Sequence, residues 1–394
     1  MLIFLVIIIP NQILSKDCSK REKKTDILKG KQIMDQTANI KIEKCKLHFH
    51  FNNNENEYNK KNNSKNHKKE ELFILKIDIS SEEKISIVLN NDYLVEKRIT
   101  KNALDKSYSD ETLSSKKLNK VCNRMFIYQY PKTFNDKTLR MYEEGKSMVI
   151  GGYYDGKIII INTEPKLVQT EMIPFNEEEP ICAITISKDE DYMFLGNMKG
   201  NIKVYKNDFE TKTWEPLYQL NDQMKEITYF DCNNKLNLWA SSTIDGYINL
   251  YSFPQCKLFR SIKVPTKNCN YIFLSSSPLP SIIVITYEKK ESEIFVYSIN
   301  GYLILRQKEQ GNISSPIIFK DLNSNDYLAY ISNGSIFIRS LPNLILHLFI
   351  EDLQDIYTIF TNKNKTILYA ANKPASEINI IKHESKKMFI SNMV

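Results

Sequence analysis

The hydrophobic pattern of this chain repeats between Asp155 and Ile378. Each copy has a continuous apolar run, a short polar turn, and a second run in which apolar and polar residues alternate. The turns begin at Asp155, Lys199, Asp245, Glu291, Asn333 and Ala375, and each ends at an isoleucine three positions later. Their second residues lie 44, 46, 46, 42 and 42 positions apart. A strand-rich period of this length predicts a β-propeller.

The two runs of each copy indicate strands in different environments. The run before the turn, such as Ile282–Ile285, is apolar without interruption, as in a strand that is buried on both faces. The run after the turn, such as Ile202–Tyr205, alternates as a half-exposed strand does. Asp-Gly, Asn-Gly and Lys-Gly supply the positive φ of a two-residue hairpin turn. The copies at Ser292 and Ser376 lack glycine, so we expect longer turns there.

A weaker unit precedes the six clear copies. Strands are indicated at Phe73–Ile77, Ile85–Leu89 and Tyr93–Val95, with Asn90–Asp92 as a turn between the last two. Polar residues 101–122 predict a loop. The total is seven units, so we predict an all-β fold, a seven-bladed WD40-like β-propeller with a disordered N-terminal arm.

Closure of such a ring commonly mixes strands from both ends of the chain in one blade, because no sheet edge is then left exposed. We therefore expect residues around 45–50 or 70–80 to complete the last blade. The predicted domains are an N-terminal region (1–69), the propeller (70–385) and a C-terminal tail (386–394).

The N-terminal region has the composition of an arm without a core. Residues 51–70 contain eight Asn and five Lys, which cannot bury enough surface to offset the entropy of ordering. Residues 16–46 are charged and predict a linker. Residues 1–9 are uniformly apolar but too short to span a bilayer as a helix. No basic residue precedes them and no clear cleavage site follows, which argues against a signal peptide. A secreted protein with Met1–Ser15 as its signal peptide is the alternative interpretation.

Charge and cysteine content narrow the functional classes. Residues 1–137 carry 27 Lys and Arg against 18 Asp and Glu, whereas the whole chain carries 54 against 47. The repeat region is therefore near neutral, and a mild surplus over a polar arm favours a solvated segment over a nucleic-acid site. The cysteine number is odd, no C-x-x-C is present, and Cys182 and Cys232 lie in apolar runs. Free buried thiols in a reducing compartment fit this pattern.

No catalytic motif stands out, and we name no catalytic, cofactor-binding or metal-binding residue and no cofactor. Phosphate-binding loops, dinucleotide fingerprints, H-E-x-x-H and G-x-S-x-G are missing from the sequence. The only clustered metal ligands of Cys/His type, Cys45, His48 and His50, have no second pair at zinc spacing. His347, between two leucines, predicts a half-buried strand histidine.

Three further features have both a structural and a functional interpretation. The acidic runs Glu177–Glu179 and Asp189–Asp191 could bind calcium, although solvated turns explain them better. Trp214 lies in a polar segment, where an exposed indole could be a hot spot for a partner or could pack on its own blade.

The repeat departs from the usual WD pattern. Trp214 is followed by Glu and Trp239 by Ala, so no Trp-Asp dipeptide is present, and no Gly-His opens a repeat. The buried His–Asp–Ser–Trp network of strong WD repeats is therefore not expected, and the blades should depend on apolar packing.

Several segments nevertheless resemble the C-terminal WD40-like propeller of BEACH-domain proteins (neurobeachin and lysosomal trafficking regulator type). Gly151–Gly156 resembles that family's G-x-W-D segment, with Tyr154 in place of Trp. Tyr297–Leu303 is similar to its Y-S-I-N-G-K-L segment. Ile244–Tyr251 with Cys256–Ile262 resembles its D-G-T-x-x-x-H…G-x-L-x-R-x-L segment.

The ends of the chain follow the same order. Ile336–Leu341 and Ile378–Ile381 fall where the family's last blades do, and Ile9–Leu14 is similar to the G-Q-T-P-x-Q-L-L tail of a BEACH domain. The BEACH domain and its PH-like neighbour are not in this sequence. Residues 1–69 would then be a BEACH tail remnant, a linker and an Asn/Lys-rich insertion.

The resemblance implies a non-enzymatic scaffold that binds other proteins in vesicle or membrane trafficking. It implies a cytoplasmic location, peripheral to endomembranes, with no nucleic acid and only indirect membrane association. Rigid blades would present loops to partners, and the candidate loops are Lys206–Leu217, Ser252–Cys256, Lys289–Glu293 and Gln307–Ser315. The alternatives are a scaffold propeller of a ciliary or coat complex and a secreted glycan-binding or hydrolase propeller.

Overall fold

A computed structural model gives the fold of the chain between residues 39 and 384. It describes residues 39–46, 74–79, 84–89, 93–101, 108–117, 139–143, 147–152, 156, 158–162, 168–175, 179–187, 191–208, 213–321, 323–351, 356–361, 365, 367–372 and 377–384. Within these residues the regular structure is 28 β-strands and one 3-10 turn, η2 (Asn234–Leu236).

The strands form seven antiparallel four-stranded sheets, which we call blades 1 to 7. Blade 1 contains β2 (Ile74–Ile79), β3 (Lys84–Leu89), β4 (Tyr93–Lys101) and β5 (Tyr108–Lys117). Blade 2 contains β6 (Leu139–Glu143), β7 (Ser147–Gly152), β8 (Ile158–Asn162) and β9 (Val168–Met172). Blade 3 contains β10 (Ile181–Ile186), β11 (Tyr192–Asn197), β12 (Ile202–Asp208) and β13 (Thr213–Leu220).

The remaining blades follow the same plan. Blade 4 contains β14 (Ile227–Asn233), β15 (Leu238–Thr243), β16 (Tyr247–Ser252) and β17 (Leu258–Lys263). Blade 5 contains β18 (Cys269–Ser275), β19 (Ser281–Glu288), β20 (Glu291–Ser298) and β21 (Leu303–Gln310). Blade 6 contains β22 (Ser314–Lys320), β23 (Asp326–Ser332), β24 (Ser335–Ser340) and β25 (Leu346–Ile350). Blade 7 contains β26 (Ile356–Thr361), β27 (Ile367–Asn372), β28 (Glu377–Glu384) and β1 (Asn39–Lys46).

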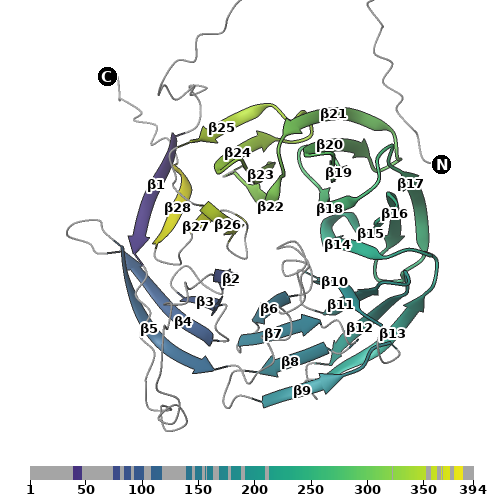
Figure 1. Cartoon of the computed structure of the whole chain (residues 1–394), viewed down its shortest axis with the longest axis horizontal. Coiled ribbons are helices and arrows are strands. Elements are labelled where there is room, and N and C mark those ends of the chain that lie inside the picture. The colour runs from purple at the N-terminus through teal and green to yellow at the C-terminus, as the bar shows by residue number, and fades with distance from the viewer. Residues whose placement is uncertain are drawn as a thin grey trace, which may run out of the picture. The chain divides into compact units, whose positions relative to one another are not determined.

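The blades follow one another around a ring. Each first strand contacts the first strand of the next blade, and β2 contacts β26, so blade 1 adjoins blade 7. The first strands lie innermost and the fourth strands outermost, as Figure 1 shows. The predicted seven-bladed β-propeller is confirmed.

Ring closure uses a segment that the sequence did not identify as a strand. β1 pairs with β28 from Asn39↔Glu384 to Lys46↔Glu377, so it is the fourth strand of blade 7. The expected linker at 16–46 is therefore wrong for residues 39–46, and a propeller boundary at residue 70 omits this strand. Of the two expected closing segments, 45–50 overlaps β1 at its end, whereas 70–80 contains β2 of blade 1. The predicted insertion at 51–70 and residues 1–38 lie outside the described residues.

Blade 1 also contains more strand than predicted. The three expected strands are present as β2, β3 and β4. The expected loop at residues 101–122 is wrong, because β5 pairs with β4 along Tyr108–Lys117. Its sequence, YSDETLSSKK, is polar because a fourth strand has a neighbour on one side only.

The hairpin turns between second and third strands differ from the two-residue prediction. Four residues connect the strands in blade 3 and three in blade 4, and among them only Gly200 (φ 93°) and Gly246 (φ 87°) have positive φ. A type I turn followed by a left-handed residue has this geometry. Asn333-Gly334 is a two-residue turn with φ of 50° and 78°.

Blade 5 has a two-residue turn as well, contrary to the expected long one. Glu288 pairs with Glu291, so the turn is Lys289-Lys290, with φ of 52° and 72°. Ser292 therefore lies inside β20. The corresponding Ala375-Ser376 segment lies outside the described residues.

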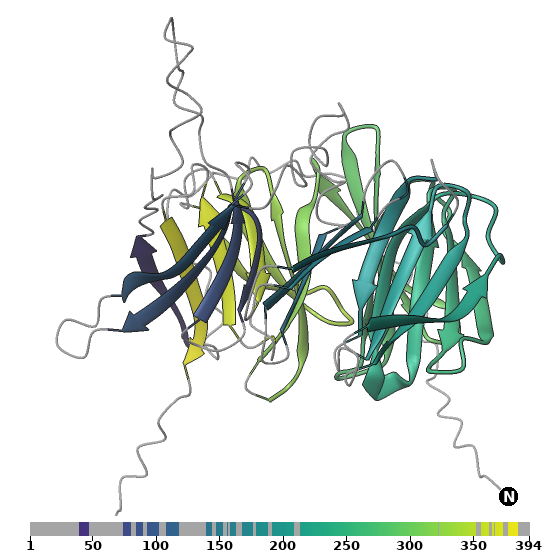
Figure 2. The same ribbon diagram turned by 90° about the horizontal axis from the view of Figure 1, so that it is seen from below.

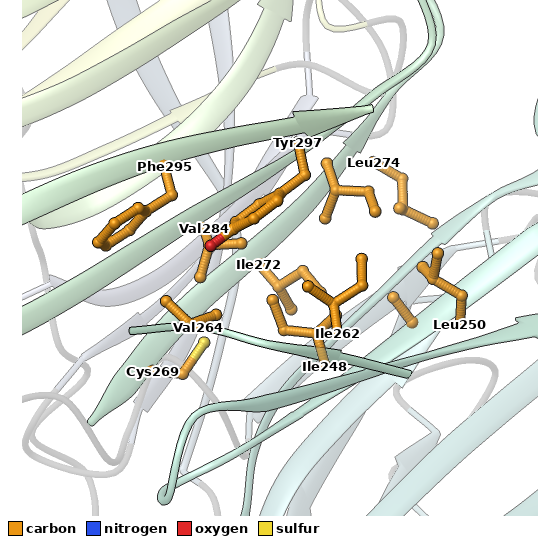
Figure 3. Packing of buried hydrophobic residues seen from close by; sticks show 12 residues of the cluster. Ile248, Leu250, Ile262, Val264, Cys269, Ile272, Leu274, Val284, Phe295 and Tyr297 are labelled. Atoms are coloured by element: carbon orange, nitrogen blue, oxygen red, sulfur yellow. The ribbon is translucent and has the colours of Figure 1, made fainter. Parts of the chain in front are cut away.

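Apolar packing between adjacent blades forms the core. The layer between blades 4 and 5 contains Ile248, Leu250, Ile262, Val264, Cys269, Ile272, Leu274, Val284, Phe295 and Tyr297, shown in Figure 3. Each of these side chains is buried. Similar layers join blades 5 and 6 and blades 6 and 7.

We expected the blades to depend on apolar packing, but buried polar contacts also hold the propeller together. The Gln223 amide, in the loop before β14, donates to Ser241 Oγ and lies 3.4 Å from Tyr251 Oη. Tyr251 stacks on Trp239 with ring centroids 4.0 Å apart. A Gln–Ser–Tyr network thus fixes the entry loop of blade 4 to its second and third strands.

A second clasp joins blades 5 and 6. Asp326 is 2% exposed, and its Oδ2 accepts hydrogen bonds from Ser275 Oγ (2.9 Å), Ser276 N (2.9 Å) and Ser277 N (3.2 Å). Its Oδ1 accepts a hydrogen bond from Lys320 Nζ. The Asp326 carboxylate, at the start of β23, thus has four donors. Three of them lie at and after the end of β18, so the carboxylate fixes the first-to-second turn of blade 5 against blade 6.

Candidate interaction surfaces

The antiparallel order of the strands defines two rims. Turns between second and third strands, together with the loops between blades, lie at one end of the sheets, which we call the glycine-turn rim. Turns between first and second strands and between third and fourth strands lie at the other end, which we call the opposite rim. Figure 2 shows the strands running between the two rims.

The opposite rim of blades 4 to 6 carries a cluster of exposed apolar side chains. They lie at the ends of turns and in the first residues of the fourth strands, and each is 46% to 75% exposed. We call this set the turn patch: Leu258, Phe259, Leu279, Tyr302, Leu303, Ile304, Ile345 and Leu346. It contains half of the exposed large apolar side chains of the described residues. Single exposed apolar residues are ordinary, but a cluster of this size marks an interaction surface.

The turns that carry the turn patch pack against neighbouring blades. The turn at Gly301 lies on β17 of blade 4, where a Cβ at Gly301 would be 3.2 Å from Arg260 Cδ and 3.3 Å from Ile262 Cγ1. Leu341 and Leu344, in the corresponding turn of blade 6, are buried in the core layer shared with blade 5. Each exposed turn is therefore seated on the preceding blade, and the patch has a rigid base.

The exposed charges within the segments that carry the turn patch are basic. Residues 233–238, 252–262, 274–281, 297–305 and 339–349 contain no Asp or Glu. The carboxylates of Asp231 and Asp326 contact the 274–281 segment, and Asp321 lies in the first-to-second turn of blade 6, but these residues are half-buried or buried. Their basic residues are Lys235, Lys257, Arg260 and Arg339, and the first three are exposed. Arg339 is paired with Glu309 of blade 5 at 2.7 Å. The patch is thus apolar with a basic border.

The glycine-turn rim has a smaller apolar set on blades 3 and 4. Met198, Met224, Ile244 and Tyr247 are exposed, Met224 at 90%. The turn below Met198 is held by Glu179, which is 6% exposed and accepts hydrogen bonds from Asn197 Nδ2 and Lys199 Nζ, both at 2.6 Å. Asp222, Glu226 and Asp245 lie among these residues, so this surface has mixed charge.

Two of the four predicted partner loops are mostly strand. Lys206–Leu217 contains the paired ends of β12 and β13, with Asn207↔Trp214 and Asp208↔Thr213, and residues 209–212 lie outside the described part. Gln307–Ser315 contains the end of β21 and the start of β22.

The other two predicted loops lie one on each rim. Ser252–Cys256 is a turn between β16 and β17 that leads into the turn patch. Lys289–Glu293 contains the tight turn of blade 5 on the glycine-turn rim and the first residues of β20.

The remaining sequence candidates have structural roles wherever they are described. Trp214 is partly buried against the core layer between blades 2 and 3, so packing, and not an exposed hot spot, explains it. His347 is half-buried in β25, as predicted, with its ring 5.0 Å from that of Tyr327. Glu179, the last residue of one acidic run, anchors a turn. Cys45 lies in β1, and His48 and His50 lie outside the described residues.

In the part of the chain that the structure describes, no three His, Cys, Asp or Glu side chains are grouped so that they could hold a metal ion. No described helix is long and apolar enough to cross a membrane. Cys182, Cys232, Cys256 and Cys269 are free thiols, and burial raises the pKa of Cys256 to about 11.

Sequence reasoning missed the turn patch, although a signal was present. In blades 4, 5 and 6 the turn after the third strand is followed by Leu258-Phe259, Tyr302-Leu303-Ile304 and Ile345-Leu346. Aligned on the bulge, the corresponding residues of β13 are Glu215, Pro216 and Leu217, of which only Leu217 is a large apolar residue. A fourth strand is expected to be exposed, so consecutive apolar residues at its start were the signal in the sequence that indicated the turn patch.

Comparisons with known proteins support the fold alone. No family model matches the chain, and no curated protein matches it. The structure is similar to the crystal structure of the WD40 β-propeller domain of Doa1, with a TM-score of 0.53 and 11% identity over 79% of this chain and 93% of that one. This similarity confirms a WD40-like propeller fold.

Proposed function

We propose that this chain is a non-catalytic protein-interaction scaffold, the C-terminal propeller module of a BEACH-type protein that acts in vesicle or membrane trafficking. The propeller fold supports the scaffold part of the proposal. The BEACH assignment rests on the order of the sequence segments described above, of which Tyr297–Leu303 is the most informative. That segment forms the end of β20 and the turn of blade 5 that contributes Tyr302 and Leu303 to the turn patch.

The turn patch is the observation that carries the scaffold proposal. Eight large apolar side chains stand half-exposed on turns that are themselves anchored in the core. The blades do not need these side chains for packing, since other residues fill the layers between them. A partner protein that covers the patch would remove the cost of exposing them to water.

The proposed setting follows from the same resemblance. We place the protein in the cytoplasm, peripheral to endomembranes, with membrane association supplied by partners or by BEACH and PH-like parts. Residues 1–69 would include the BEACH tail remnant and linker, except for β1. Transcripts that extend upstream of Met1 test this part: a reading frame that encodes the rest of a BEACH fold supports it, and an in-frame stop directly upstream refutes it.

The scaffold function is tested by comparing partners of matched variants in native cells. The tagged full chain is compared with Tyr302→Ser/Leu303→Ser/Ile345→Ser, which alters the turn patch, and with Met224→Ser on the glycine-turn rim. Cross-linking followed by mass spectrometry should recover a set of proteins with the parent chain and Met224→Ser that the triple variant loses. Identical sets for all three proteins would contradict the proposal, provided circular dichroism shows that each variant folds.

A further inference from the structure

We propose that the turn patch binds an acidic amphipathic helix of a partner protein. The inference rests on the proposed scaffold function and specifies the chemistry of what the scaffold binds. Three properties of the patch support it: the sign of its charges, the interruption of its strand edges, and its area.

Charge favours an acidic partner. Lys257 and Arg260 are exposed next to Leu258 and Phe259 in the chain, and Lys235 is exposed on the same rim. The carboxylates that contact these segments are shielded, since Asp326 is buried against Lys320 and Asp231 is half-buried and bonded to Leu274 N. A basic partner would therefore meet exposed cations without an exposed anion in these segments, which costs free energy at a desolvated interface. Glutamate or aspartate on the partner would instead be attracted to this border.

The strand edges favour a helix over an added strand. In blades 4 and 5 the register shifts beside Phe259 and Ile304, each of which is an extra residue in its fourth strand. A β-bulge interrupts the row of N–H and C=O groups that an added strand would need. The bulges lie within the patch, so a partner must contact its side chains, as an amphipathic helix does with residues at i, i+3, i+4 and i+7.

The area of the patch suits a protein interface. With roughly 150–250 Å² for each large side chain, eight side chains that are about half exposed present on the order of 800 Å², which is the share of one partner in a standard interface. The patch also extends from Leu279, at a first-to-second turn, to Ile304, in the outer strand β21. A flat bilayer would reach only part of such a bent surface.

The test uses a displayed library of helical peptides as the probe. Each peptide carries leucine at i, i+3, i+4 and i+7, and its flanking positions vary between Glu and Lys. Selection on the immobilised full chain should enrich Glu at the flanking positions. The best peptide should bind at least tenfold more weakly when its Glu residues are replaced by Lys, and at least tenfold more weakly to Tyr302→Ser/Leu303→Ser/Ile345→Ser.

Charge reversal on the protein gives a second, independent readout. The variant Lys257→Glu/Arg260→Glu changes two exposed side chains and leaves the core unaltered. Selection on this variant should shift toward Lys at the flanking positions, while Met224→Ser should keep the preference for Glu.

Several outcomes would overturn the inference. Enrichment of Lys, no enrichment, or binding that the triple variant retains would each do so, and the scaffold proposal would stand if the triple variant still loses its cellular partners. Vesicles of phosphatidylcholine with phosphatidylserine provide the remaining arm. Sedimentation of the chain with these vesicles, lost in the triple variant, would assign the patch to a lipid surface and refute a helical partner.

Discussion

Replacing Asp326 by asparagine should strongly destabilise the propeller, because it breaks a buried ion pair and its hydrogen bonds. The carboxylate is 2% exposed and receives three hydrogen bonds from the Ser275–Ser277 turn and one from Lys320. Asparagine keeps the shape of the side chain but removes its charge. One of its two terminal atoms becomes an N–H donor, which must then face either the serine donors or the Lys320 ammonium.

The magnitude follows from the environment of the pair. Lys320 is only 17% exposed, so the variant leaves a largely buried ammonium without its counter-ion. Removal of one partner of a buried ion pair costs about 3–5 kcal/mol. Since some water reaches the lysine, we expect about 3 kcal/mol for Asp326→Asn, at the lower end of that range.

The assay is urea unfolding of the full chain, followed by tryptophan fluorescence because Trp239 is buried in the adjacent blade 4. Asp321→Asn is the matched control, since Asp321 is half-buried and bonds mainly to Asn323 and Asn325 in its own turn. The control should cost about 1 kcal/mol or less. The double variant Asp326→Asn/Lys320→Met should recover part of the loss, because no buried charge is then left unpaired. A cost of Asp326→Asn equal to that of the control, or no recovery in the double variant, would refute this account of the clasp.

Two further predictions concern the glycine turns and the buried thiol. Gly200→Ala should cost about 2–3 kcal/mol, because its φ is positive and the new Cβ would lie 2.5 Å from the Gln223 carbonyl oxygen. Gly334→Ala, with a similar φ but no atom within 4 Å, should cost only about 1 kcal/mol in urea unfolding; equal costs would contradict the packing argument. Burial raises the pKa of Cys256 from 9.0 to about 11, so its native alkylation at pH 8 should be much slower than after denaturation. Because the folded-state pKa is the higher one, the contribution of the thiol to stability is full below pH 9 and declines as pH rises toward 11. Cys256→Ala should therefore show a smaller loss of stability over that pH range than the parent chain, and an unchanged loss would exclude this cause.

The inner part of each blade could be predicted from the sequence. β15 and β19 contain the apolar runs Leu238–Ala240 and Ile282–Ile285, lie between two other strands of their own sheet, and are buried over most of their length. Burial on both faces favours such runs, and small Ser and Thr side chains occupy the other buried positions, so the hydrophobic pattern and the structure agree there. The regular spacing of these runs gave the number of blades.

The fourth strands could not be predicted in the same way. β13 is exposed along most of its length and β5 is polar, while β1 alternates only at Ile40 and Ile42, so none of them has a long apolar pattern. Strands of this kind are formed by backbone hydrogen bonds to the third strand, which any sequence without proline at a bonded position can make. The segments Asn39–Lys46, Tyr108–Lys117 and Thr213–Leu220 therefore had the composition of linkers and loops.

Turn geometry was the second limit of the sequence. The rule that links positive φ to glycine and asparagine led us to place the turn of blade 5 near Ser292, whereas Lys289 and Lys290 form it. Left-handed lysines cost free energy, and pairing of β19 with β20 as far as Glu288↔Glu291 offsets that cost. Tertiary pairing decided the turn, and local preference did not.

The same comparison of fourth strands explains why the turn patch points to a partner. β13, β17, β21 and β25 occupy equivalent places, and each has a bulge at the same position, where Leu217, Phe259, Ile304 and His347 are the extra residues. Two positions before the bulge, β13 has Glu215 and the segment before β17 has Lys257, where blades 5 and 6 have Tyr302 and Ile345, so a fourth strand does not require an apolar residue there. Exposed apolar clusters favour aggregation, and the bulges protect only the backbone edge against it. Tyr302 and Ile345 therefore bring a cost that folding does not explain, and contact with another molecule is the physical reason that would.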